Sequence, residues 1–169
     1  MYRHRETQTE WAQCDCADTA DAGLLLGAHL VTQRRGYVHH GIYVGEGKVI
    51  HYAGFSRCMH PGPVELISVA GFASGFAVYV RRYRCTTYAG DEVAHRAGSR
   101  LGENDYRLLS NNCEHFCSWC LFGECRSEQV DACLRNPLLA LLALRAVTSV
   151  LIARLARECK PMLTRLQAA

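Results

Sequence analysis

The stretch Asn111-Asn112-Cys113-Glu114-His115-Phe116 places a cysteine directly behind polar residues that are suited to cap a helix. Three residues are candidates for the N-cap: Ser110, Asn111 and Asn112. The apolar pattern of residues 116–122 continues the helix, and Gly123 is suited to end it. Cys113 is then expected in the first turn, where the helix dipole and unpaired N–H groups favour the thiolate, the nucleophilic form of cysteine. The stretch therefore predicts a thiol nucleophile at a helix N-terminus, which needs a base from elsewhere in the chain.

Two histidines upstream lie on either side of a tight turn. Residues 37–44 and 48–52 have strand-like patterns and are joined by Gly45-Glu46-Gly47, which predicts a β-hairpin. Paired strands bring residues such as His39 and His51 close together on one face. One of them is then placed to take the proton of Cys113, and the other to hold the first ring in the right tautomer. The alternative is that both histidines are packed or surface residues with no catalytic role.

The other segments predict a single α+β domain with additions at both ends. Further strands are expected within residues 23–32, 64–69 and 77–83, and a helix over residues 92–101 with Asp91 as its cap. We divide the chain into a polar arm (1–22), a catalytic domain (23–126), a connector (127–136), and an apolar, then basic, helical segment (137–169).

Composition narrows the class of protein. Hydrophobic residues make up 49% of the 169 residues, which is typical of a folded domain rather than a disordered chain. The net charge of +3 does not by itself indicate nucleic acid binding, and we expect none. The N-terminus lacks the pattern of a signal peptide, so the ten cysteines are expected to be reduced in the cytoplasm, with a disulfide scaffold as the weaker alternative.

The two motifs together resemble those of the lecithin:retinol acyltransferase-like family. The first motif is Tyr37-Val38-His39-His40-Gly41-Ile42-Tyr43-Val44-Gly45-Glu46-Gly47-Lys48-Val49-Ile50-His51, and the second is Asn112-Cys113-Glu114-His115-Phe116. The family pattern is a histidine, an I-Y-V-G-x-G hairpin and a second histidine, followed much later by an N-C-E-H-F box. Both motifs occur here in that order, and the resemblance covers residues 27–124.

This resemblance implies a fold, a reaction and a set of roles. The fold would be α+β, a small antiparallel sheet packed with helices, as a circularly permuted relative of the papain-like and NlpC-type thiol hydrolases. Cys113 would form an acyl-thioester, His39 would act as general base and acid, and His51 would orient His39. The acyl donor would be a glycerophospholipid, the acceptor an alcohol, an amine or water, and no cofactor would be needed. The alternatives are a thiol amidase or peptidase, and a non-enzymatic interaction module of the same fold.

The chain departs from the family pattern at two places. Gly27 is followed by Ala28, where the family often has an acidic residue, and His40 occupies the position of a tryptophan in many animal members. Because successive strand residues face opposite sides, we expect His40 to be the outward neighbour of His39. The alternative is that it takes over the role of His39.

The remaining cysteines and histidines near the second motif are expected to be structural. Cys117 and Cys120 have the spacing of zinc ligands, but a second clean pair is missing, so we interpret them as small buried side chains and expect no metal site. His115 is expected to bond to the backbone, and Glu114 to be a first-turn charge rather than an acid catalyst.

The C-terminal segment allows three interpretations. Residues 138–153 are apolar except for Arg145, and basic residues follow. Residues 138–157 are expected to lie on a membrane surface, or to pack against the domain or a second copy in a homodimer. A membrane span is the third interpretation, since the apolar stretch is short of the roughly 20 residues that a spanning helix needs. We therefore expect a cytoplasmic protein, with peripheral or anchored attachment to a membrane as an open alternative.

Overall fold

The computed structural model describes residues 10–14, 23–55, 61–88, 90–138, 140–142, 144–146, 148–149 and 152–153. Its strands are β1 (Glu10–Cys14), β2 (His29–Arg34), β3 (Tyr37–Tyr43), β4 (Lys48–Gly54), β5 (Gly62–Ser68) and β6 (Val78–Arg82). Its helices are α1 (Val69–Ala73), α2 (Gly90–Ser99), α3 (Cys113–Phe122) and α4 (Glu128–Arg135). The chain forms two compact units, Met1–Arg34 with Val38–Glu128, and Arg35–Tyr37 with Gln129–Ala169.

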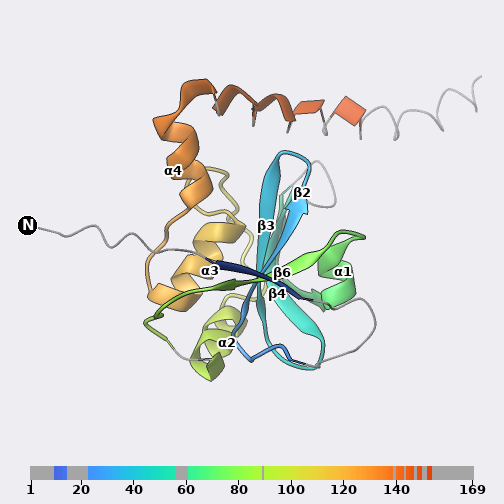
Figure 1. Cartoon of the computed structure of the whole chain (residues 1–169), viewed down its shortest axis with the longest axis vertical. Helices are drawn as coiled ribbons and strands as arrows, with labels where there is room; N and C mark the ends of the chain where they lie inside the picture. The colour runs from blue at the N-terminus through green and yellow to red at the C-terminus, as the bar shows by residue number, and fades with distance from the viewer. Residues whose placement is uncertain are drawn as a thin grey trace, which may run out of the picture. The chain divides into compact units, whose positions relative to one another are not determined.

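The described strands form one six-stranded sheet in the order β1-β6-β2-β3-β4-β5 (Figure 1). The pairs β1–β6, β2–β6, β3–β4 and β4–β5 are antiparallel. In the β3–β4 hairpin, Ile42 lies opposite Ile50 and Tyr43 opposite Val49. The turn between them runs through three residues with positive φ: Gly45, Glu46 and Gly47. The α+β class and the hairpin predicted from residues 37–52 are therefore confirmed.

Both faces of the sheet are covered. One core cluster joins Ile42, Ile50 and Tyr52 to the buried side chains of α2 and α3, among them Phe116. The other joins Tyr43 and Val49 to Phe72 of α1. Residues that are neighbours along a strand thus belong to different clusters, as the alternation of a β-strand requires. Figure 1 shows α2 and α3 on one side of the strands and α1 on the other.

The structure differs from the sequence-based expectations mainly at element ends. Glu10–Cys14, within the segment interpreted as an arm, form β1 and pair with Val78–Arg82. Helix α2 begins at Gly90, so Asp91 lies in its first turn rather than at its cap. Residues Val69–Ala73 form the short helix α1, capped by the Ser68 hydroxyl, which accepts a hydrogen bond from Gly71 N.

From Gln129 onward, the described residues of the second unit are helical apart from Asn136. Helix α4 ends at Arg135, and the residues described from 137 to 153 are helical. Several of its large apolar side chains are exposed: Leu134, Leu138, Leu141, Leu142, Leu144 and Ile152. Within the residues that the structure describes, none of the helices combines the length and apolarity needed to cross a bilayer.

Candidate active site

Helix α3 begins at Cys113 because Asn112 caps it. The Asn112 Oδ1 atom accepts hydrogen bonds from Glu114 N at 2.9 Å and His115 N at 3.1 Å. In return, His115 Nδ1 accepts from Asn112 N at 3.4 Å, which completes a capping box. Asn112 is therefore the N-cap among the three candidates, and His115 bonds to the backbone as expected.

The thiol of Cys113 is held in a buried nest of main-chain donors. Cys113 is 4% exposed, and burial raises the pKa of its thiol to about 12. Hydrogen bonds from the N–H groups of His40, Cys113 and Glu114 act to lower that pKa, while the Glu114 carboxylate raises it. The helix N-terminus thus contributes in the expected direction, but desolvation is larger, and the resting group is a neutral thiol. The expected net lowering of this pKa is therefore wrong for the described state.

His39 and His51 are in direct contact. His39 Nε2 lies 2.8 Å from His51 Nδ1, and the two rings meet edge to face with their centroids 4.9 Å apart. Phe72 of α1 stacks on His39, with 5.3 Å between the ring centroids. Burial lowers the pKa of His39 well below its usual value, and the charges of His51, Arg34 and His40 lower it further. The strand pairing predicted from the sequence therefore places the two imidazoles together.

Gly41 provides the space for this contact. A Cβ atom at Gly41 would lie 2.5 Å from Val49 Cγ1 and 2.9 Å from Phe72 Cε2, well inside van der Waals contact. It would also lie 3.3 Å from the Cβ of His51. A side chain at this position would force Val49, Phe72 or His51 to move, because protein interiors are close-packed.

The thiol reaches β3 at the peptide next to His39. The His40 N–H that bonds to Cys113 belongs to the peptide joining His39 to His40. Cys113 belongs to the core cluster of α3, whereas the two imidazoles pack on Phe72. The structure therefore brings His39 and His51 into contact, and the start of α3 sets Cys113 against the peptide of β3 that joins His39 to His40. The hydrogen bonds described for the thiol come from the main chain rather than from an imidazole.

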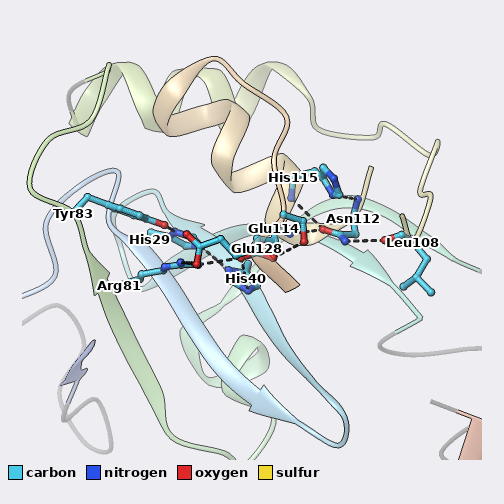
Figure 2. A network of polar contacts seen from close by, with 10 residues as sticks. His29, His40, Arg81, Tyr83, Leu108, Asn112, Glu114, His115 and Glu128 are labelled. Atoms are coloured by element: carbon cyan, nitrogen blue, oxygen red, sulfur yellow. Dashed lines mark hydrogen bonds and ion pairs between the residues drawn. The ribbon is translucent and has the colours of Figure 1, made fainter. Parts of the chain in front are cut away.

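The carboxylate of Glu114, the residue after Cys113, is buried in an ion-pair network (Figure 2). Arg81 Nη1 donates to Glu114 Oε1 at 3.0 Å, and the Ser127 hydroxyl donates to Glu114 Oε2 at 2.5 Å. Arg81 Nη2 also donates to Glu128 Oε2 at 2.5 Å. A buried carboxylate is tolerated only when it is paired and hydrogen-bonded, so this network anchors the first turn of α3 to β6.

His29 and His40 extend the network across the sheet. His40 Nδ1 lies 2.9 Å from His29 Nε2, and His29 Nδ1 lies 2.8 Å from the Tyr83 hydroxyl. The other nitrogen of His40 lies 4.0 Å from Glu114 Oε1. His40 is only 1% exposed, so it is not an outward strand residue, and its Nδ1 atom holds the ring against His29. Figure 2 shows His40 directed toward His29 and Glu114.

One carboxylate that the motifs do not contain lies against the histidine pair. Glu65 Oε1 is 3.2 Å from His51 Nε2, and Glu65 lies directly opposite His51 in the β4–β5 register. The signal in the sequence is weak, because the expected strand at residues 64–69 carries no information about its register against β4. Arg81 was missed because its partner Glu114 lies on α3, 33 residues away, and no local pattern shows that the two meet.

The cysteines of α3 behave as core residues. Cys117 and Cys120 are fully buried in the cluster that contains Phe116, as expected for small apolar side chains. In the described part of the chain, no group of three or more histidine, cysteine, aspartate or glutamate side chains is arranged to hold a metal ion.

Comparisons with known proteins identify the family. The sequence profile of the lecithin retinol acyltransferase family matches residues 23–126. The chain is 32% identical over 151 residues to phospholipase A and acyltransferase 2 of Homo sapiens, which covers 79% of this chain and 93% of that protein. It is 29% identical over 134 residues to lecithin retinol acyltransferase of Rattus norvegicus, which covers 63% of this chain and 58% of that protein. The matched residues include His39, His51 and Cys113, and this chain belongs to the lecithin retinol acyltransferase family.

Proposed function

We propose that this protein is a thiol-dependent acyltransferase or phospholipase A-type hydrolase that acts on the acyl chains of glycerophospholipids through a Cys113 thioester. The names of its relatives, lecithin retinol acyltransferase and phospholipase A and acyltransferase, support acyl transfer from a phospholipid. The observation that carries the proposal is the His39–His51 contact beside the capped start of α3. A nucleophile, a base and a residue that orients the base are the parts that thiol catalysis needs.

In the first half of the reaction, His39 takes the proton of Cys113 and the thiolate attacks the ester carbonyl carbon. Because the resting thiol is neutral and bonded to main-chain N–H groups, its side chain turns toward His39 for this transfer. The tetrahedral adduct collapses as the carbon–oxygen bond breaks, and His39 returns the proton to the departing lysolipid oxygen. The products are a lysophospholipid and the Cys113 acyl-thioester.

In the second half, an alcohol, an amine or water releases the acyl chain. His39 takes the proton of the acceptor as its oxygen or nitrogen attacks the thioester carbonyl, and the Cys113 sulfur leaves and recovers that proton. With water the reaction is phospholipid hydrolysis, and with the other acceptors it is acyl transfer. Turnover restores the starting thiol, so no cofactor is consumed.

The main-chain N–H groups around the thiol are suited to hold the oxyanion of both tetrahedral adducts. The N–H groups of His40 and Cys113 are among the main-chain donors that lower the pKa of the thiol. Donors fixed before the reaction stabilise developing negative charge without reorganisation. We assign these two groups as the oxyanion donors.

The test is intact-protein mass spectrometry after mixing the protein with a short-chain phosphatidylcholine. We expect an added acyl mass that maps to Cys113 and is absent in Cys113→Ala and Cys113→Ser, together with released lysolipid. His39→Ala should lower thioester formation by about 100-fold or more, the usual contribution of a general base. Cys85→Ala, which removes an exposed cysteine, is the control and should acylate normally.

Two results would contradict the proposal. An acyl adduct that persists in Cys113→Ala would place the nucleophile elsewhere. No adduct and no lysolipid with the wild-type protein would exclude this acyl donor chemistry, and a peptide and amide panel would then be examined.

A further inference from the structure

We propose that Glu65 is a positioning residue of this site, which fixes the tautomers of His51 and His39 and thereby selects the nitrogen of His39 that receives the proton. The inference rests on the proposed function, because it assigns a role in the same reaction. It concerns a residue of β5 that lies outside both sequence motifs.

The strand register builds the contact. His51 of β4 and Glu65 of β5 are directly opposite each other in an antiparallel pair that also joins Ile50 to Leu66 and Val49 to Ile67. Side chains directly opposite on one face are close enough to interact. Here Glu65 Oε1 lies 3.2 Å from His51 Nε2, with the side chain of His51 buried and that of Glu65 24% exposed.

The tautomers follow from donor and acceptor chemistry. Glu65 Oε1 and His51 Nε2 lie at ion-pair distance but do not meet the geometry of a hydrogen bond. An ionised carboxylate attracts a donor hydrogen and only accepts hydrogen bonds, so its position favours the His51 tautomer that carries the hydrogen on Nε2. Neutral His51 then has a lone pair on Nδ1, and this atom lies 2.8 Å from His39 Nε2. The hydrogen of neutral His39 is therefore on Nε2, and its Nδ1 carries the lone pair that accepts a proton.

The carboxylate also matters once His39 is protonated. Burial lowers the pKa of His39, and the groups that add to this effect are His51 of β4, Arg34 of β2 and His40 of β3. The α1 side chain against the ring, Phe72, is uncharged. Glu65 at the far end of the pair is the negative group that stabilises the imidazolium through His51, as a carboxylate does in a catalytic triad.

The neighbouring histidine has no equivalent arrangement. His40 has one nitrogen bonded to His29 and the other facing Glu114, so its ring is held in a structural network. The chain of Glu65, His51 and His39 instead ends on a nitrogen with a defined lone pair. The contacts from Glu65 through His51 to His39 thus distinguish His39 from His40, although the two histidines are adjacent in the sequence.

The first experiment measures the tautomers directly, without lipid. Long-range proton–nitrogen NMR spectra of the ¹⁵N-labelled full chain should show His51 and His39 with their hydrogens on Nε2. Glu65→Ala should move His51 toward the Nδ1–H tautomer, whereas Glu65→Gln, which keeps an oxygen acceptor, should retain the wild-type tautomer. Wild-type His51 with its hydrogen on Nδ1, or unchanged spectra of His51 and His39 in Glu65→Ala, would overturn the inference.

The second experiment measures the rate of thioester formation against pH. Glu65→Gln should slow acylation by about tenfold, a part of the general-base contribution, with the phospholipid concentration for half-maximal rate unchanged. Because the imidazolium loses a stabilising charge, the acid limb of the profile should move to lower pH. Glu46→Gln is the matched control, since it removes an exposed carboxylate from the β3–β4 turn of the same sheet.

The two experiments separate the inference from the proposed function. If the wild-type thioester forms on Cys113 but Glu65→Ala has the wild-type rate and pH profile, the role of Glu65 is wrong and the proposed function stands. If no thioester forms, the proposed function fails, and the NMR result alone decides whether Glu65 sets the tautomers.

Discussion

His40 is a buried base whose ionisation opposes folding. Burial lowers its pKa from 6.5 to about 4, although the nearby Glu114 carboxylate acts in the opposite direction and Arg81 lowers it further. Burial also lowers the pKa values of His29 and His39 well below the usual value. Three neutral imidazoles therefore lie in the core of one domain, and each of them gains a proton more easily in the unfolded chain.

The free energy of unfolding should consequently fall in acid. Between pH 6.5 and about 4 the unfolded chain binds more protons than the folded chain at His40, so stability rises with pH in this window. The stabilisation is complete above pH 6.5 and is lost as the pH falls toward 4. Each such histidine adds up to about 1.4 kcal/mol per pH unit to the slope.

Urea unfolding across this pH window measures the slope. His40→Gln should reduce the slope by the contribution of one histidine, whatever its effect on stability at neutral pH. His95→Gln, at an exposed position of α2, is the control and should leave the slope unchanged. A wild-type slope in His40→Gln would show that His40 is not buried as a neutral group.

The residues of the site differ in how far the sequence predicts them. Cys113, His39 and His51 belong to motifs, so their residue types and spacing can be read directly from the sequence. Arg81 and Glu114 are 33 residues apart, and their pairing depends on how α3 packs over β6. Glu65 meets His51 only through the β4–β5 register, which no local pattern fixes. The sequence therefore does not show which side chains of different helices and strands contact each other.

At the scale of elements, helix α3 depends on its cap. Asn112 satisfies two N–H groups of the first turn and ties its own amide to Leu108 O at 2.8 Å. Asn112→Ala should lower the free energy of unfolding by about 1–2 kcal/mol, and Asn112→Ser, which keeps an oxygen acceptor, by less. It should also slow thioester formation, because the first turn positions the Cys113 sulfur.

Chemical unfolding and the thioester assay measure the two effects together. Ser110→Ala is the matched control, since Ser110 is an exposed N-cap candidate that the structure does not use. If Asn112→Ala had wild-type stability and acylation rate, the capping box would have no role in placing the nucleophile.

Element types were easier to predict than element ends. Residues 37–44 and 48–52 predict β3 and β4 because the glycines of the turn mark where one strand ends and the next begins. Glu10–Cys14 gave no such signal, since they become a strand only by pairing with β6, far away in the sequence. The end of α3 could be predicted because a glycine follows its last residue, and glycine readily adopts the left-handed conformation that ends a helix. Gly123 has this conformation, with φ of 79°.

At the scale of the whole molecule, we propose that the C-terminal segment holds the protein at a membrane surface. Its described residues expose Leu138, Leu141 and Leu142, and basic residues follow in the sequence. We expect removal of all residues after Asn136 to lower co-sedimentation with vesicles that contain phosphatidylserine. Each basic residue near such a surface contributes about 1 kcal/mol, so the loss should exceed tenfold.

The deletion variant also distinguishes the other interpretations of this segment. Its thioester formation on a soluble short-chain lipid should match that of the full chain, because the proposed catalytic residues precede Asn136. Unchanged vesicle binding would exclude the membrane role, and a fall in molecular mass by sedimentation velocity would then favour a homodimer.

The burial of Cys113 among main-chain donors has a consequence for the resistance of its thiol to oxidation. Peroxides oxidise the thiolate far more readily than the neutral thiol, and a pKa of about 12 leaves almost no thiolate at rest. The low exposure of this residue further limits access by oxidants. In the proposed mechanism, Cys113 thus stays a neutral thiol, protected from sulfenic acid formation, until a lipid binds and His39 takes its proton. The burial that protects the Cys113 sulfur from oxidation between turnovers thus also requires His39 to deprotonate it during each proposed turnover.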